Sequence, residues 1–189
     1  MARAAVKISD EADDDALMLR VLARDAAAFR RMIDAYSKTL HRIAYRMIGD
    51  ATEAEDVTQE AFLRLWQHAD RWQGGGPGIG AWLARVAMNL CLDRLRRRRF
   101  ASDEAVPDRA DDAPLAIETI INAQQRANVV AAIASLPDRQ RAAIVLTYYE
   151  DYSNADAAEL LDMNIKAFES LLLRARGALR KAFGQEDEA

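Results

Sequence analysis

An acidic, proline-containing stretch between two blocks of helical periodicity constrains this chain most. Residues 101–115 hold two prolines, one arginine and five acidic residues, with no apolar period. Such a composition is typical of a linker. On both sides of it, apolar residues recur at spacings of three and four, as along one face of an α-helix. The sequence therefore predicts an all-α protein of two small helical domains joined by a flexible acidic linker.

The domain boundaries are predicted from these breaks in periodicity. We expect a disordered N-terminal tail over residues 1–13, a first domain over 14–99, the linker over 100–116, a second domain over 117–184 and an acidic tail over 185–189. The first domain is expected to contain helices over about 14–48, 51–69 and 81–98. Gly49 is the expected stop of the first of these helices, and Asp50 is the expected N-cap of the second.

The second domain is predicted to end in a helix-turn-helix. Helices are expected over 117–135 and 138–150. Ser153 opens a short helix, and Asn164 caps a last helix over 165–183. A short helix, a tight turn and a longer helix form the motif that places its second helix in the DNA major groove. The core stripe of the last helix is expected to contain Phe168, Leu172, Ala175, Leu179 and Phe183.

Several classes of function are disfavoured by what the chain contains. The single cysteine, Cys91, cannot form an intramolecular disulfide and is expected in the core. His41 and His68 are too few for a metal site or a catalytic triad, so neither a metal nor another cofactor is expected. No apolar run approaches the length of a membrane span, which predicts a cytoplasmic protein without membrane insertion.

A glycine-rich segment over residues 74–80 raises the alternative of a nucleotide-dependent enzyme. A phosphate loop needs a preceding strand and a following lysine and hydroxyl residue, and the sequence predicts neither. The segment is therefore predicted to be a loop between two helices. No catalytic base or nucleophile accompanies it, so we expect neither an enzyme nor a small-molecule substrate.

Polar ridges on two predicted helices are candidates for binding surfaces. The net charge of −4 argues against a nucleic-acid partner, but the first 100 residues carry a balance of +3. A solvated helix face is the alternative for the ridge of Arg85, Asn89 and Asp93. The arginine run at the end of the first domain favours function, because neighbouring cations repel unless an anion lies nearby. The first ridge contains Asp56, Gln59, Glu60 and Leu63; the second contains Arg85, Asn89 and Asp93, followed by Arg94 and Arg96–Arg99.

Four segments together resemble the extracytoplasmic-function (ECF) sigma factors of the bacterial sigma-70 family. They occur in the order and spacing typical of that family, and the resemblance covers about residues 15–183. The segments are AEDVTQEAFLRLW at 54–66, AWLARVAMNLCLDRLRR at 81–97, LPDRQR at 136–141 and RAR at 174–176. The resemblance implies a sigma-2 helical bundle followed by a sigma-4 helix-turn-helix domain.

The resemblance also implies partners for each surface. The first ridge matches the surface that docks on the coiled coil of the polymerase β′ subunit, and the second domain implies contact with the β flap. Arg85, Asn89 and Asp93 match positions that recognise the promoter −10 element. Trp72 and the glycine-rich segment match the loop that captures a flipped-out base. Arg94 and Arg96–Arg98 suit the phosphates around that base.

The last helix is implied to recognise the promoter −35 element. The residues on its predicted exposed face are Lys166, Glu169, Ser170, Leu173 and Arg174. The family often has lysine and arginine at the places of Glu169 and Leu171. A glutamate can accept a hydrogen bond from cytosine N4, and a leucine can touch a thymine methyl. The last helix can therefore still discriminate between bases, although it attracts phosphates less strongly.

The implied function is that of a promoter-specificity subunit in a stress response, controlled by a cognate anti-sigma factor that can hold it at the membrane. The alternative is a stand-alone helix-turn-helix regulator that binds duplex DNA without polymerase. We expect the free chain to be compact and unable to bind DNA. In that state the linker covers the Arg94–Arg99 cluster, while Asp56, Gln59, Glu60 and the last helix are hidden.

Overall fold

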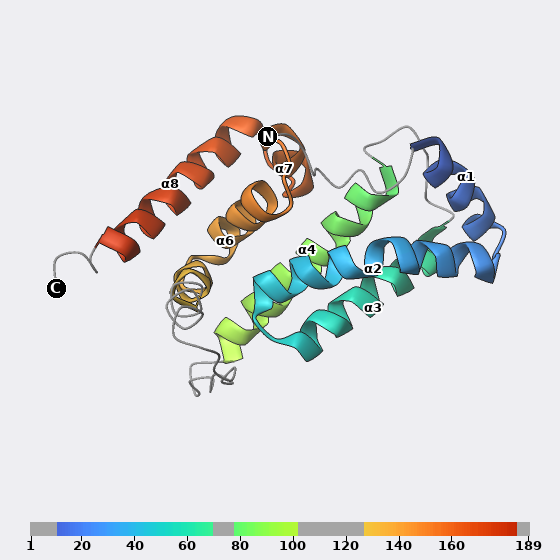
Figure 1. Ribbon diagram of the computed structural model, residues 1–189, viewed down its shortest axis with the longest axis horizontal. Helices are drawn as coiled ribbons and strands as arrows, with labels where there is room; N and C mark the ends of the chain where they lie inside the picture. The colour runs from blue at the N-terminus through green and yellow to red at the C-terminus, as the bar shows by residue number, and fades with distance from the viewer. Residues whose placement is uncertain (1–10, 70–77, 102–126, 185–189) are drawn as a thin grey trace, which may run out of the picture.

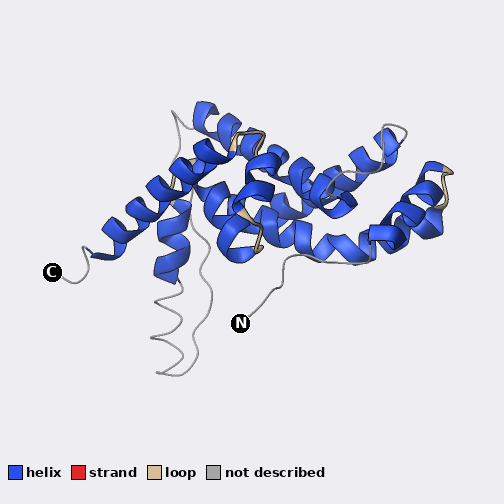
Figure 2. Cartoon of the chain, turned by 90° about the horizontal axis from the view of Figure 1, so that it is seen from above, coloured by secondary structure: helices blue, strands red, loops and turns tan. Residues whose placement is uncertain are grey.

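Every element that the structure describes is a helix (Figure 2). The structure is a computed structural model that describes residues 11–69, 78–101 and 127–184. The long helices are α1 (Glu11–Leu22), α2 (Ala26–Ile48), α3 (Ala51–His68), α4 (Gly78–Ala101) and α8 (Ile165–Gly184). The shorter elements are a helical segment over 127–134, α6 (Asp138–Ile144), the π-helix η2 (Val145–Tyr149) and α7 (Asn154–Leu160). The predicted all-α class is confirmed.

Helices α1 to α4 pack into one bundle, with α2 against each of the other three (Figure 1). The buried stripe of α2 supplies Met32, Tyr36, Leu40, Ile43 and Met47, whose three- and four-residue spacing gives one buried face. Burying such a stripe is the main source of stability for an amphipathic helix. Beside it lies a buried polar pair, in which the Tyr36 hydroxyl donates to the Asp14 carboxylate over 2.5 Å.

The single helix predicted over 14–48 is wrong, because the chain breaks between α1 and α2. Arg24 adopts a left-handed backbone with φ of 62°. Asp25 then caps α2, and its carboxylate accepts from the amides of Ala27 at 2.9 Å and Ala28 at 3.2 Å. Helix α1 also begins at Glu11, before the expected start of the first domain, while residues 1–10 lie outside the described residues.

The predicted capping signals of the bundle are confirmed. Gly49 has φ of 78°, the left-handed conformation that ends helices, and its amide donates to the Tyr45 carbonyl. Asp50 follows as the N-cap of α3, and its side chain accepts from the Glu53 amide over 2.8 Å. The turn from α2 to α3 is therefore set by two adjacent residues.

In the second domain α6 and α7 pack on the buried face of α8 (Figure 1), while η2 contacts α6 and α7. Ser153 caps α7 by accepting from the Asp156 amide over 3.1 Å, and Asn164 accepts from the Ala167 amide over 2.9 Å at the start of α8. Both predicted caps are confirmed. The core expected on α8 is shorter than predicted: Phe168, Leu172 and Ala175 are buried and Leu179 partly so, but Phe183 is 36% exposed because α8 extends past its supporting helices.

The helix predicted over 138–150 changes its winding at Val145. Helix α6 ends at Ile144, and the π-helix η2 continues to Tyr149. At the other end of the linker region, α4 extends to Ala101, so the first two residues of the predicted linker are helical. Residues 102–126 and the tail over 185–189 lie outside the described residues.

Candidate nucleic-acid interface and docking surface

The first ridge is an exposed strip along α3, which we call the α3 surface and define as Asp56, Gln59, Glu60 and Leu63. Val57, Ala61 and Leu65, spaced four residues apart, face the bundle core, so the residues one position before or two positions after them point away from the core. Asp56 and Gln59 are exposed, and Leu63 is 48% exposed although it is apolar. Glu60 is half-buried and accepts from Arg64 over 2.9 Å. The strip therefore combines acid, amide and apolar groups accessible to a partner.

An apolar groove that the sequence did not reveal adjoins the α3 surface. It has a volume of about 870 Å³ and lies between α2 and α3. Its lining includes Phe29, Ile33, Phe62, Leu63 and Trp66. Phe29 packs on Trp66 with ring centroids 4.8 Å apart. Grooves of this character accept the apolar face of an amphipathic helix.

Trp66 is held in the groove wall by an arginine from the α1–α2 turn. The Arg24 guanidinium lies 5.0 Å from the centroid of the Trp66 ring, and its NH1 donates to the Trp66 carbonyl over 2.6 Å. The same left-handed residue that breaks the predicted helix thus supports the groove. Only the tertiary fold brings these two residues together.

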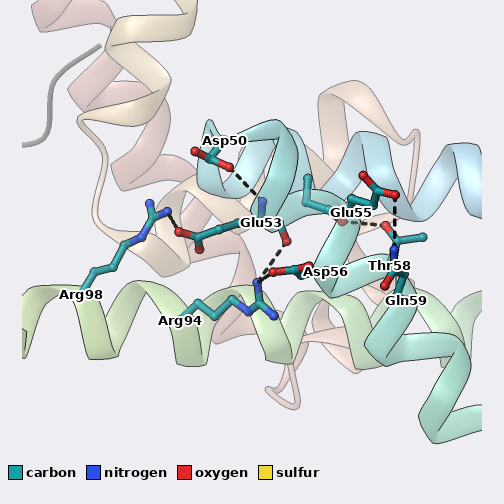
Figure 3. A network of polar contacts seen from close by, with 9 residues as sticks. Asp50, Glu53, Glu55, Asp56, Thr58, Gln59, Arg94 and Arg98 are labelled. Carbon is teal, nitrogen blue, oxygen red and sulfur yellow. Dashed lines mark hydrogen bonds and ion pairs between the residues drawn. The ribbon is translucent and has the colours of Figure 1, made fainter. Parts of the chain in front are cut away.

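Helices α3 and α4 are joined by a polar network beside the α3 surface (Figure 3). Arg94 NH1 donates to the Glu53 carbonyl over 3.1 Å and lies 3.8 Å from the Asp56 carboxylate. Arg98 pairs with the Glu53 side chain. Gln59 donates to Glu55 over 3.2 Å on the far side of Asp56. A candidate phosphate-binding arginine and a candidate protein-docking aspartate are therefore neighbours.

Carboxylates of α3, α4 and α6 partly neutralise the arginine run. Besides the contacts of Arg94 and Arg98, Arg96 pairs with Asp93 over 2.9 Å, and Arg99 pairs with Asp138 of the second domain. These anions satisfy the expectation that the cluster needs nearby negative charge. The part of the linker predicted to supply it lies outside the described residues. Arg96 to Arg99 remain exposed at the end of α4 and accessible to a phosphate backbone.

The second ridge lies along α4, and its three members differ in surroundings. Asn89 is exposed, whereas Arg85 and Asp93 are half-buried. Arg85 donates to the Glu159 carbonyl of α7 and lies 3.9 Å from the Glu159 carboxylate. The structure places Asn89 and Asp93 in line with the arginine run. Trp72 and residues 74–77 of the predicted base-capturing loop lie outside the described residues. Its last three residues, 78–80, are not a loop as predicted but the start of α4, where Ile79 is buried in the bundle core.

The predicted recognition residues of α8 share one solvent-facing side. Lys166, Glu169, Ser170, Leu173 and Arg174 are all exposed, and Leu173 is 66% exposed. Ser170 Oγ donates to the Lys166 carbonyl over 2.9 Å, and Arg174 Nε donates to the Ser170 carbonyl over 3.2 Å. Leu171, by contrast, is buried and belongs to the core. The expected exposed face of the helix-turn-helix is confirmed.

The sequence predicted a compact chain in which these surfaces are hidden, and this prediction is wrong for the arrangement in the structure. The two domains do touch, since α2 and α4 contact α6, η2 and α7. Asp56, Gln59 and the α8 face nevertheless stay exposed. Among the predicted site residues, Arg85 donates a hydrogen bond to the second domain and Arg99 pairs with its Asp138.

Two further expectations concern reactive groups. Cys91 is fully buried, and burial raises the pKa of its thiol to about 12, so it stays a protonated core residue near neutral pH. Within residues 11–69, 78–101 and 127–184, no group of three histidine, cysteine or acidic side chains is placed to hold a metal ion. None of the helices in those ranges is long and apolar enough to cross a bilayer.

A helical bundle with an arginine-rich helix, next to a helix-turn-helix with an exposed second helix, is the arrangement of a DNA-binding protein. The family model for Sigma-70 region 2 matches residues 32–101, and the model for Sigma-70, region 4 matches residues 126–179. The chain belongs to the sigma-70 family of RNA polymerase sigma factors, in its ECF group.

Relatives support this placement over most of the chain. The ECF RNA polymerase sigma factor SigL of Mycobacterium tuberculosis is 35% identical over 159 residues, which cover 84% of this chain and 90% of SigL. The ECF RNA polymerase sigma factor SigW of Bacillus subtilis is 30% identical over 168 residues, covering 83% of this chain and 89% of SigW.

Solved structures show the same fold at lower identity. CnrH, solved in complex with the cytosolic domain of CnrY, matches with a TM-score of 0.70 and 24% identity over 93% of this chain and 99% of that one. RpoE of Bartonella quintana, solved with the anti-sigma factor NepR, matches with a TM-score of 0.65 and 22% identity, over 82% of this chain and 96% of that one.

Proposed function

We propose that this sigma factor uses the α3 surface and groove to dock on core RNA polymerase, and its two domains to select promoters. Residues 14–99 would bind polymerase and the −10 element, residues 117–184 the −35 element, and residues 100–116 would join them. The observation that carries the proposal is the adjacency of the α3 surface to the arginines of α4, with Arg94 and Asp56 3.8 Å apart. Docking there brings the arginine cluster directly beside polymerase.

The α3 surface suits the coiled coil of the β′ subunit. A coiled coil presents charged residues beside an apolar seam. Asp56 and Gln59 can pair with the charges, while exposed Leu63 and the groove behind it accept the seam. The second domain would contact the β flap.

The −10 element would be recognised along α4. Asn89 is exposed and can offer an amide donor and acceptor to a base edge, with Arg85 and Asp93 beside it. Trp72 and the glycine-rich segment would enclose a flipped-out base, and Arg94 with Arg96–Arg98 would hold the flanking phosphates. Binding energy alone would open the duplex, and the polymerase would perform the catalysis.

The −35 element would be recognised by α8, entering the major groove with its N-terminal half. Lys166 and Arg174 can contact phosphates or guanine, Glu169 and Ser170 can accept or donate at base edges, and Leu173 can touch a thymine methyl. The exposure of all five side chains supports this assignment.

An anti-sigma factor would regulate the chain. RpoE of Bartonella quintana is solved with the anti-sigma factor NepR, and CnrH with the cytosolic domain of CnrY. By analogy we place this chain in the cytoplasm, bound by a cognate inhibitor that can hold it at the membrane, and released during a stress response.

The test of the proposed function is transcription in vitro from fragmented genomic DNA with core polymerase. Discrete start sites should appear only when the chain is added, and should share −10 and −35 sequences. Tight binding of the isolated chain to the same DNA, without any start sites after polymerase is added, would instead identify a stand-alone regulator.

Replacing Asn89 by alanine should relax or abolish base choice at one −10 position, at a cost of roughly 1–3 kcal/mol at the preferred base. The matched change of Arg97 and Arg98 to alanine should weaken all promoters alike and reduce the salt slope by about 0.9 per lost phosphate contact. Open-complex formation on a −10 library at several salt concentrations measures both effects. A uniform loss from both changes would contradict the division between base recognition and phosphate binding.

A further inference from the structure

A buried carboxylate joins the two domains of this chain. Glu150 follows η2, and its side chain is 0% exposed. It accepts from Arg42 Nε at 3.0 Å and Arg42 NH2 at 2.5 Å, and from Arg46 NH1 at 2.8 Å. Both arginines belong to α2 of the first domain, more than 100 residues earlier in the chain.

The backbone around Glu150 directs it toward α2. The π-helix ends there, where the Glu150 amide donates to the Val145 carbonyl over 3.2 Å, and the next residue, Asp151, has φ of 54°. The guanidinium of Arg46 also lies 4.3 Å from the centroid of the Tyr149 ring. The end of η2 therefore offers both an acid and an aromatic ring to the same helix.

Two more contacts extend this interface. Arg141 NH1 donates to the Met47 carbonyl at the C-terminus of α2 over 2.5 Å. Arg85 of α4 donates to the Glu159 carbonyl of α7. The contact therefore engages α2 and α4 on one side and α6, η2 and α7 on the other.

Electrostatics makes this contact selective and reversible. A carboxylate buried with its cationic partners gains Coulomb energy but loses hydration, so the pair contributes little net stability. When the domains separate, water reaches Glu150, Arg42 and Arg46 together, and no charge is left buried. If the arginines alone are changed, the closed form must bury an unpaired carboxylate, which is strongly unfavourable.

The closed form is incompatible with binding both promoter elements. The −10 and −35 elements are centred about 25 base pairs apart, or roughly 85 Å along straight DNA at about 3.4 Å per base pair. Lys166 is seven residues beyond Glu159, whose carbonyl Arg85 contacts. Seven residues span at most about 25 Å. The start of α8 therefore lies too close to Arg85 for the two helices to reach both elements.

We propose that the α2 face bearing Arg42 and Arg46 is a docking site for the second domain of the same chain, with Glu150 as the anchor. The second domain must leave this site before the chain can bind a promoter. The inference rests on the proposed function for its consequence, but the docking itself is a property of the free chain. It adds α2 as a regulatory face, separate from the α3 surface.

Energy transfer between dyes on the two domains tests the docking directly. Ala16 on α1 and Ala178 on α8 are exposed sites for engineered cysteines, and Cys91 is buried away from the label. Arg42→Glu with Arg46→Glu, and separately Glu150→Arg, should each lower the population of the closed form about tenfold or more, because like charges then face each other. The three changes together should restore high transfer.

The matched control is Arg30→Ala with Arg31→Ala. These exposed arginines lie on the same helix, about 17 Å along its axis from Arg42, and changing them should leave the transfer unchanged. Circular dichroism on every variant should show unaltered helicity. Unchanged transfer in both charge reversals, or transfer that stays low in the triple variant, would overturn the inference.

Polymerase-dependent transcription separates this inference from the proposed function. Loss of docking with normal start sites supports both. Charge reversals that open the chain, with no start sites from the unmodified protein, would leave the docking standing and overturn the proposed function.

Discussion

Asp56→Arg combined with Gln59→Ala is expected to abolish co-purification of the chain with core RNA polymerase. The two side chains are exposed and adjacent on α3, beside the apolar groove. Reversing a charge at the centre of an interface typically places like charges together and removes a hot spot. A loss of about 2–4 kcal/mol corresponds to a rise in Kd of roughly 30- to 700-fold.

Controls separate docking from folding. Asp34→Arg reverses another exposed carboxylate, on α2, and should leave binding intact. Arg94→Ala removes the partner of Asp56 without altering the α3 surface. This variant should therefore retain polymerase binding while its affinity for DNA falls. Surface plasmon resonance on immobilised core polymerase gives the constants, and circular dichroism checks helicity. Undiminished binding by the double variant would remove the α3 surface from the docking site.

The features that sequence predicted well are those determined within a few residues. Asp50, Ser153 and Asn164 each cap a helix through the amide three residues on, so their types and spacing suffice. The exposed faces of α3 and α8 follow from helical period for the same reason. The two candidate ridges could therefore be predicted from the sequence without the tertiary structure.

The break between α1 and α2 was hidden by continuous apolar periodicity. Leu17, Val21, Ala28 and Met32 all face the same core at helical spacing, so the pattern runs through the break. Asp25 is a good N-cap, but no acidic residue lies in the first turn of α2 to complete the signal. The π-helix was missed similarly, because one wider turn alters the period too little to detect.

Tertiary contacts account for what could not be predicted. Phe29 and Ile33 fit the core stripe of α2, yet they are only partly buried and line the groove between α2 and α3. The pairing of Glu150 with Arg42 and Arg46 joins residues more than 100 positions apart, and sequence offers no signal that selects this acid among the 30 in the chain. Both the apolar groove and the contact between the two domains arise from tertiary packing.

Arg141→Met should destabilise the chain strongly, because a buried guanidinium is removed from several carbonyl groups. Arg141 is 9% exposed and donates to the carbonyls of Met47, Ala134 and Leu136. Burial lowers the pKa of Arg141, but a guanidinium remains charged in proteins. Methionine fills similar space without a donor, and buried carbonyls left unpaired cost roughly 1–3 kcal/mol. Urea unfolding monitored by circular dichroism measures the change.

Arg139→Met provides the comparison within the same helix. Arg139 is exposed and donates one hydrogen bond, to the Leu161 carbonyl over 3.2 Å, so its loss should cost about 1 kcal/mol or less. The urea midpoint should therefore shift several times further for Arg141→Met than for Arg139→Met. Because Arg141 contacts α2 as well as the turn before α6, part of its effect should disappear in the Glu150→Arg background, where the domains are already apart. Equal shifts for the two arginines would show that the buried guanidinium does not hold these carbonyls.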